Sequence, residues 1–100
     1  MKVTTEDNFG ILTVAVEGEI NTITAPQVAA CVEDLSSAWK LVFDLDQVRY
    51  VSSAGLRLFL TCQRTMSEKG GDMEIINCND FLMEIMQSVG YDRIMKLERK

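Results

Sequence analysis

A polar junction between two apolar segments constrains the fold of this chain more than any other feature of its sequence. The segment Val51-Ser52-Ser53-Ala54-Gly55-Leu56 lies between the apolar run Leu41 to Leu45 and the amphipathic run Leu56 to Met66. A short apolar run indicates a buried strand, whereas apolar residues at helical spacing indicate a helix. The sequence therefore predicts a strand, a loop over residues 46–53 and a helix, with hydroxyl groups where the loop enters the helix.

The other elements follow from periodicity and from turn residues. The expected strands are Lys2 to Glu6, Ile11 to Val16, Trp39 to Leu45 and Met73 to Cys78. The first expected helix runs from about Ala25 to Ser36-Ser37, the second from Ala54 to Lys69, and the third from Asn79-Asp80 to Gly90. The first two strands should form an antiparallel hairpin, and the third should be central and covered on both faces. The tail from Tyr91 to Leu97 has no clear pattern. These elements predict one α/β domain over residues 1–100, a mixed four- to five-stranded sheet with helices packed against it.

The first helix has a local start signal and an apolar stripe. Thr24 and Gln27 have the spacing of a capping box, and Pro26 is tolerated in a first helical turn. The apolar positions follow helical spacing and should face the core. They are Val28, Cys31, Val32 and Leu35.

The composition excludes several classes of function. The chain contains no histidine, which removes serine triads, Cys-His dyads and imidazole metal ligands. The net charge of −5 argues against nucleic-acid binding, because phosphate groups require a basic patch. The three cysteines are widely spaced and suit buried positions better than disulfides or zinc. Without a membrane-length apolar run or a signal peptide, the expectation is a cytoplasmic protein that binds no cofactor.

The junction serines can act as a helix cap or as a chemical switch. Either Ser52 or Ser53 can cap the helix by accepting a backbone N–H bond. A phosphate on either hydroxyl would instead add about −1.5 to −2 charges where the helix dipole favours an anion. Gly55 suits either a tight turn or the close approach of another surface. The residues alone leave these alternatives open.

The segment from Leu41 to Leu56 resembles the signature of the STAS domain family, the anti-sigma factor antagonists of bacterial partner-switching pathways. The segment from Gly18 to Pro26 is similar to the glycine, turn and helix start of that family. Residues 71–90 resemble its later strand and helix. The resemblance therefore covers nearly the whole chain.

The resemblance implies a regulatory module that is a substrate and not an enzyme. The unphosphorylated form would bind an anti-sigma factor serine kinase and free a sigma factor, phosphorylation on Ser53 would release the kinase, and a serine phosphatase would restore the module. Ser53 is selected because the phosphoacceptor of the family lies two residues before the glycine of the Gly-Leu pair. The partner surface would comprise Asn21, Thr22, Asp46, Ser52, Ser53, Ala54, Gly55 and Leu56. Nothing in the sequence demands more than a monomer in the free state.

The sequence departs from the family pattern at two positions, and two other functions compete with the anti-sigma factor antagonist. Asn21 and Ser52 stand where the family often has aspartate, and Ser52 is a second candidate acceptor. A rival reading is a STAS-like regulatory or scaffold subunit of a transporter or lipid-transport complex, in which Ser53 would be only a cap. A hydrolase that uses Asp44 and Asp46 lacks a histidine or a metal cluster in support.

Overall fold

A five-stranded mixed sheet forms the framework of the fold, and the computed structural model describes residues 1–100. In spatial order the strands are β1 (Lys2–Asn8), β2 (Ile11–Ile20), β3 (Lys40–Val51), β4 (Asp72–Cys78) and β5 (Lys96–Arg99). β1 pairs antiparallel with β2, and the other neighbouring strands pair in parallel. The predicted hairpin and the central position of β3 are confirmed, and the fifth strand begins in the tail without clear periodicity.

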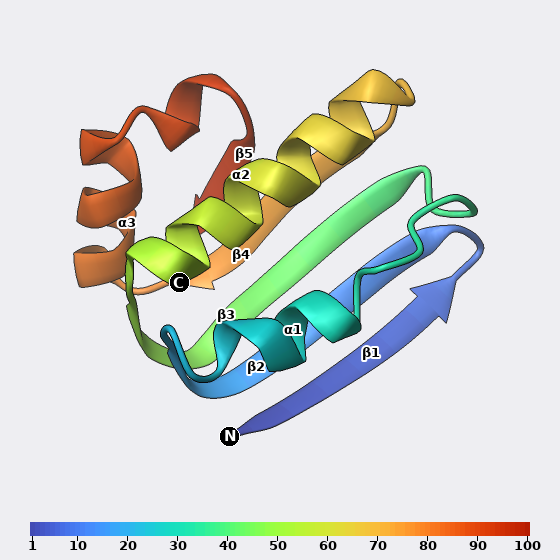
Figure 1. The fold of residues 1–100 in the computed structure, drawn as a ribbon. Coiled ribbons are helices and arrows are strands. Elements are labelled where there is room, and N and C mark those ends of the chain that lie inside the picture. The colour runs from blue at the N-terminus through green and yellow to red at the C-terminus, as the bar shows by residue number, and fades with distance from the viewer.

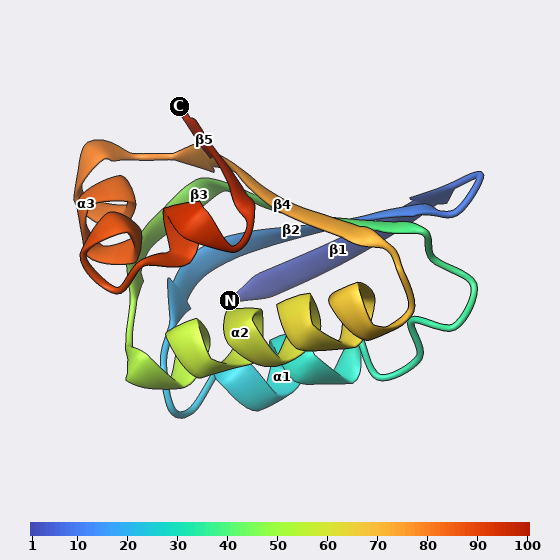
Figure 2. The same cartoon turned by 90° about the horizontal axis from the view of Figure 1, so that it is seen from above.

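The helices lie on one face of the sheet (Figure 2). They are α1 (Ala25–Ala30), α2 (Ser53–Glu68) and α3 (Asp80–Ser88), followed by the 3₁₀ turn η1 (Tyr91–Arg93). α1 and α2 run side by side across the sheet, and α3 stands at the end where α2 begins (Figure 1). None of the three has the length and apolar character needed to cross a lipid bilayer.

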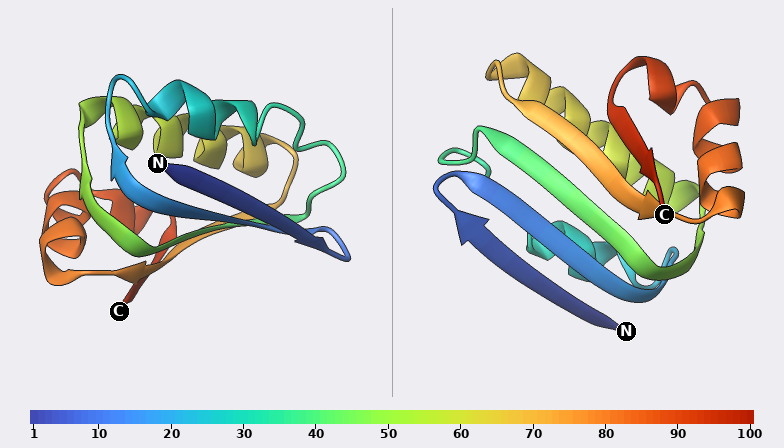
Figure 3. Two further views of the ribbon diagram at one scale, coloured as in Figure 1. Left: turned by 90° about the horizontal axis from the view of Figure 1, so that it is seen from below. Right: turned by 180° about the vertical axis from the view of Figure 1, so that it is seen from behind.

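The opposite face of the sheet carries no helix (Figure 3), so the prediction that β3 is covered on both faces was wrong. Within the apolar run, Asp44 is only half-buried, and its carboxylate accepts a hydrogen bond of 2.9 Å from the Asn77 amide of β4. This polar contact between neighbouring strands satisfies the carboxylate where no helix covers it.

β3 is longer than the sequence indicated, and the expected loop over residues 46–53 is wrong. The parallel ladder with β2 continues past Leu45 through two irregularities in register and ends with Ile20 opposite Val51. Only Ser52 then separates β3 from α2. The polar residues after Leu45 belong to the strand because their backbone continues to pair with β2, and this pairing does not depend on the polarity of their side chains.

The first helix is shorter than predicted and ends at Ala30. The amides of Cys31 and Val32 bond three residues back, to the carbonyls of Val28 and Ala29, which tightens the last turn. Further on, the Lys69 ammonium donates to the carbonyls of Leu35 and Ser36. A side chain at the end of α2 thus binds backbone carbonyls of the segment between α1 and β3.

A core of 24 buried residues fills the space between the sheet and the helices. Phe43 of β3 and Phe59 of α2 lie at its centre, with ring centroids 5.0 Å apart. Cys62 and Cys78 are buried as expected, and burial raises the pKa of each thiol to about 11, so both stay protonated near neutral pH. Cys31 is half-buried, because α1 ends just before it.

Candidate functional site

The β3–α2 junction places its two serines in different environments. Ser52 occupies the N-cap position in an extended conformation, and its amide donates to the carbonyl of Ile20 over 2.8 Å. Its hydroxyl oxygen is buried and has no hydrogen-bond partner. Ser53 is the first residue of α2 and is exposed. Ser52 thus holds the N-cap position, but no side chain accepts a hydrogen bond from the first amides of α2, so the cap considered as one alternative lacks its hydrogen bond.

The start of α2 is electropositive and has no neutralising group. Its first turn contains no acidic residue, and no side chain accepts its free amides. The aligned peptide dipoles place a partial positive charge at such an end. The exposed hydroxyl of Ser53 therefore stands at a position that suits a negative group.

The loop between β2 and α1 is held beside this junction by the pairing of β2 with β3. The Asn21 carboxamide oxygen accepts from the amides of Ile23 and Thr24 at 2.9 and 3.0 Å, and the Thr24 hydroxyl accepts from the Asn21 amide at 2.9 Å. This reciprocal pattern is a capping box that begins at Asn21. The expected capping box between Thr24 and Gln27 is wrong. Thr24 is instead the second member of the box that begins at Asn21, and its side chain makes no cap bond at the start of α1.

An apolar groove of about 440 Å³ lies between α1 and α2, and Ala54, which follows Ser53 in the chain, lines it. The residues that line it are Thr22, Ala25, Pro26, Ala29, Ala54, Arg57, Leu58 and Thr61. Ile23, in the adjoining loop, leaves 80% of its surface exposed. The structure thus brings Thr22 and Ala54 to one surface. Sequence reasoning missed the groove and Ile23, although an isoleucine among polar turn residues was a usable signal.

Other residues of the expected partner surface lie elsewhere. Asp46 borders a separate polar hollow, where hydrogen bonding by the Gln47 amide and the nearby Lys100 ammonium lower the pKa of its carboxyl. Gly55 is buried, and Leu56 is half-buried against the core. Gly55 has no side chain to offer a partner, and the Leu56 side chain packs partly against the core.

An exposed aromatic pair lies at the same end of the sheet. Tyr50, near the end of β3, stacks on Phe81 in the first turn of α3, with ring centroids 6.2 Å apart. Both rings remain about half exposed. The sequence did not single out this pair, because the two residues are 31 positions apart and belong to different elements.

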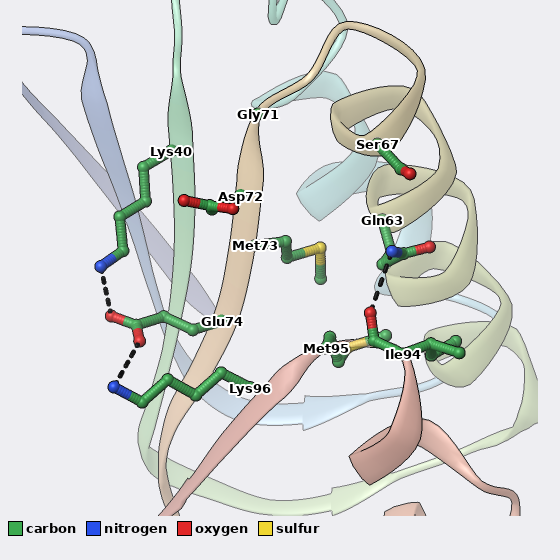
Figure 4. A pocket seen from close by; sticks show the side chains of 10 residues that line it. All are labelled: Lys40, Gln63, Ser67, Gly71, Asp72, Met73, Glu74, Ile94, Met95 and Lys96. Atoms are coloured by element: carbon green, nitrogen blue, oxygen red, sulfur yellow. Dashed lines mark hydrogen bonds and ion pairs between the residues drawn. The ribbon is translucent and has the colours of Figure 1, made fainter.

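A further hollow of about 440 Å³ lies between α2, β4 and the segment before β5 (Figure 4). Three of its four charged side chains are already paired, since the Glu74 carboxylate bonds the ammonium groups of Lys40 at 3.2 Å and Lys96 at 3.7 Å, whereas Asp72 has no ion-pair partner. The Gln63 amide donates to the carbonyl of Ile94 over 3.0 Å. Because most of these polar groups satisfy one another, the hollow leaves only the Asp72 carboxylate and the Ser67 hydroxyl without a partner.

The buried hydroxyl of Ser52 leads to a prediction about stability. We expect Ser52→Ala to raise the free energy of unfolding by about 1 kcal/mol, because it removes a desolvated hydroxyl without a partner. Urea denaturation followed by circular dichroism measures the change. The matched control is Ser53→Ala, which should stay within about 0.5 kcal/mol because that side chain is exposed. A loss of about 1 kcal/mol in Ser52→Ala would show that the hydroxyl does cap the helix.

Comparison with known proteins agrees with this architecture. The family model described as STAS domain matches residues 2–100. The anti-sigma-B factor antagonist of Listeria monocytogenes is 26% identical over 85 residues, which cover 83% of this chain and 75% of that protein. An anti-sigma factor antagonist from Mycobacterium paratuberculosis superposes with a TM-score of 0.86 at 23% identity, covering 99% of this chain and 86% of the other. The anti-sigma factor antagonist SpoIIAA of Bacillus is 15% identical and was solved in two forms, each of which covers 96% of this chain. The unphosphorylated form superposes with a TM-score of 0.84 over 87% of its own chain. The phosphorylated form superposes with a TM-score of 0.79 over 90% of its own chain. The chain belongs to the STAS domain family.

Proposed function

We propose that this chain is an anti-sigma factor antagonist that is switched by phosphorylation of Ser53. The observation that carries the proposal is the difference between the two serines: Ser53 is exposed at the start of α2, whereas the hydroxyl of Ser52 is buried. Burial argues against Ser52 as a second acceptor, because a kinase must reach the oxygen. Membership in the STAS family and the relatives named as antagonists support the same role.

In this proposal the chain is a substrate and supplies no catalytic group. The Ser53 hydroxyl oxygen attacks the γ-phosphorus of ATP held by an anti-sigma factor kinase, the bond to the β–γ bridging oxygen breaks, and ADP leaves. The hydroxyl proton passes to a base of the kinase. A serine phosphatase later hydrolyses the phosphate ester and restores the hydroxyl. All these steps would take place in the cytoplasm.

The unphosphorylated surface suits a protein partner. The capped loop at Asn21 and Thr22, the exposed Ile23 and the small residue Ala54 form a surface without acidic groups beside Ser53. A phosphate there would add about −1.5 to −2 charges and bulk. A kinase packed against this surface in the unphosphorylated state would be released, and it could then bind its sigma factor.

The test is phosphorylation of the purified chain by the anti-sigma factor kinases of its source organism, followed by intact mass measurement. We expect the wild-type chain and Ser52→Ala to gain one phosphate each, and Ser53→Ala to gain none while it still binds the kinase. Phosphate on Ser53→Ala would refute the assignment. If protein taken from its native cells never carries phosphate, the transporter-type regulatory module is the better account.

A further inference from the structure

Arg57 is an unpaired cation one helical turn after Ser53. Side chains four residues apart lie on the same face of a helix, and both residues are exposed. None of the four ion pairs in the chain includes Arg57, although the chain has 15 acidic residues and a net charge of −5. The protein therefore leaves this guanidinium without a carboxylate partner.

The position of Arg57 is unfavourable for the unmodified helix. A cation near the N-terminal end of a helix opposes the dipole, and the first turn of α2 has no acidic residue to compensate for it. An anion at Ser53 would interact favourably with the helix dipole and would offset the unfavourable position of the Arg57 cation. An acidic group four residues before a basic one is also the favourable orientation for such a pair on a helix.

We propose that Arg57 is the intramolecular counterion of the phosphate on Ser53. The proposal rests on the proposed phosphorylation and assigns a residue that regulates its outcome. The planar guanidinium can donate two parallel N–H bonds to phosphate oxygens. Arg57 also lines the α1–α2 groove beside Ala54. Phosphorylation thus draws the guanidinium from the groove toward the helix end, and the partner surface changes in shape as well as in charge.

The pair can be tested without any kinase. Phosphoserine is inserted at position 53 of the full chain by an expanded genetic code, and the second pKa of the phosphate is measured by ³¹P NMR. We expect the second pKa of the phosphate to be about half a pH unit lower in the chain that retains Arg57 than in the Arg57→Gln variant, because the guanidinium favours the dianionic form of the phosphate. Arg57→Lys should give an intermediate value, because an ammonium keeps the charge but loses the fork geometry.

The matched control is Arg64→Gln, which removes the same charge from another exposed position of α2. It should leave the phosphate pKa unchanged, and salt near 1 M should largely abolish the difference caused by Arg57→Gln. Equal phosphate pKa values with and without Arg57 would overturn the proposal. Because the phosphate is installed directly, a lowered pKa would stand even if no kinase modified Ser53, so the two proposals fail separately.

Discussion

Replacing Phe59 by alanine should lower the free energy of unfolding by about 4 kcal/mol. The side chain has no exposed surface, and its ring lies against that of Phe43 at a centroid distance of 5.0 Å and an interplanar angle of 58°. The truncation leaves a cavity where α2 packs on the central strand, and it removes an aromatic contact that contributes beyond its buried area. A loss of this size is a large part of the stability of a 100-residue domain.

Urea unfolding monitored by circular dichroism gives the magnitude, and Phe9→Ala is the matched control. Phe9 is 95% exposed at the tip of the hairpin, so the same truncation should change stability by no more than about 0.5 kcal/mol. If Phe59→Ala cost no more than Phe9→Ala, α2 would not be anchored on β3 through this ring.

The order of the elements could be predicted from the sequence because most of their signals are local. The turn between Asn8 and Ile11, the apolar run of β3 and the two glycines after α2 each act within a few residues. Their boundaries depend on distant partners. The segment after α1 is bound by Lys69, more than 30 residues away, and the end of β3 depends on continued pairing with β2.

The candidate site could be predicted only in part. The segment around Ser53 carries a recognisable motif, but the different burial of Ser52 and Ser53 depends on which residue begins the helix. A shift of one residue around a helix end turns a side chain by about 100 degrees, because a turn contains about 3.6 residues. The α1–α2 groove combines residues from two elements, so no single segment of sequence reveals it.

Gly55 connects the core to the site, and Gly55→Val should lower the free energy of unfolding by about 3 kcal/mol. A Cβ atom at this position would lie 2.5 Å from Val51 Cγ1 and 2.8 Å from Ile20 Cγ2. Both neighbours are buried and β-branched, so they have few other rotamers. The gain in helix propensity over glycine is only about 0.5 kcal/mol and cannot offset the clash.

The same substitution should also disturb the first turn of α2. Val51 and Ile20 end the two strands that carry the site loops, so relief of the clash must move the helix start away from them. Hydrogen exchange at the Leu56 amide reports this, because that amide donates to the Ser52 carbonyl at 2.9 Å in the first helical bond. We expect exchange at Leu56 to accelerate more than the loss of global stability alone would cause.

Gly70→Ala separates this clash from ordinary backbone strain. Gly70 has φ of +78°, and an added Cβ would meet no atom within 4 Å, so the cost should be about 1 kcal/mol, with no specific effect on exchange at Leu56. Equal costs for the two substitutions would mean that Gly55 is not needed for close packing. A larger cost at Gly55, together with faster exchange at Leu56, would show that the packing of one glycine against two strand ends holds Ser53 in place.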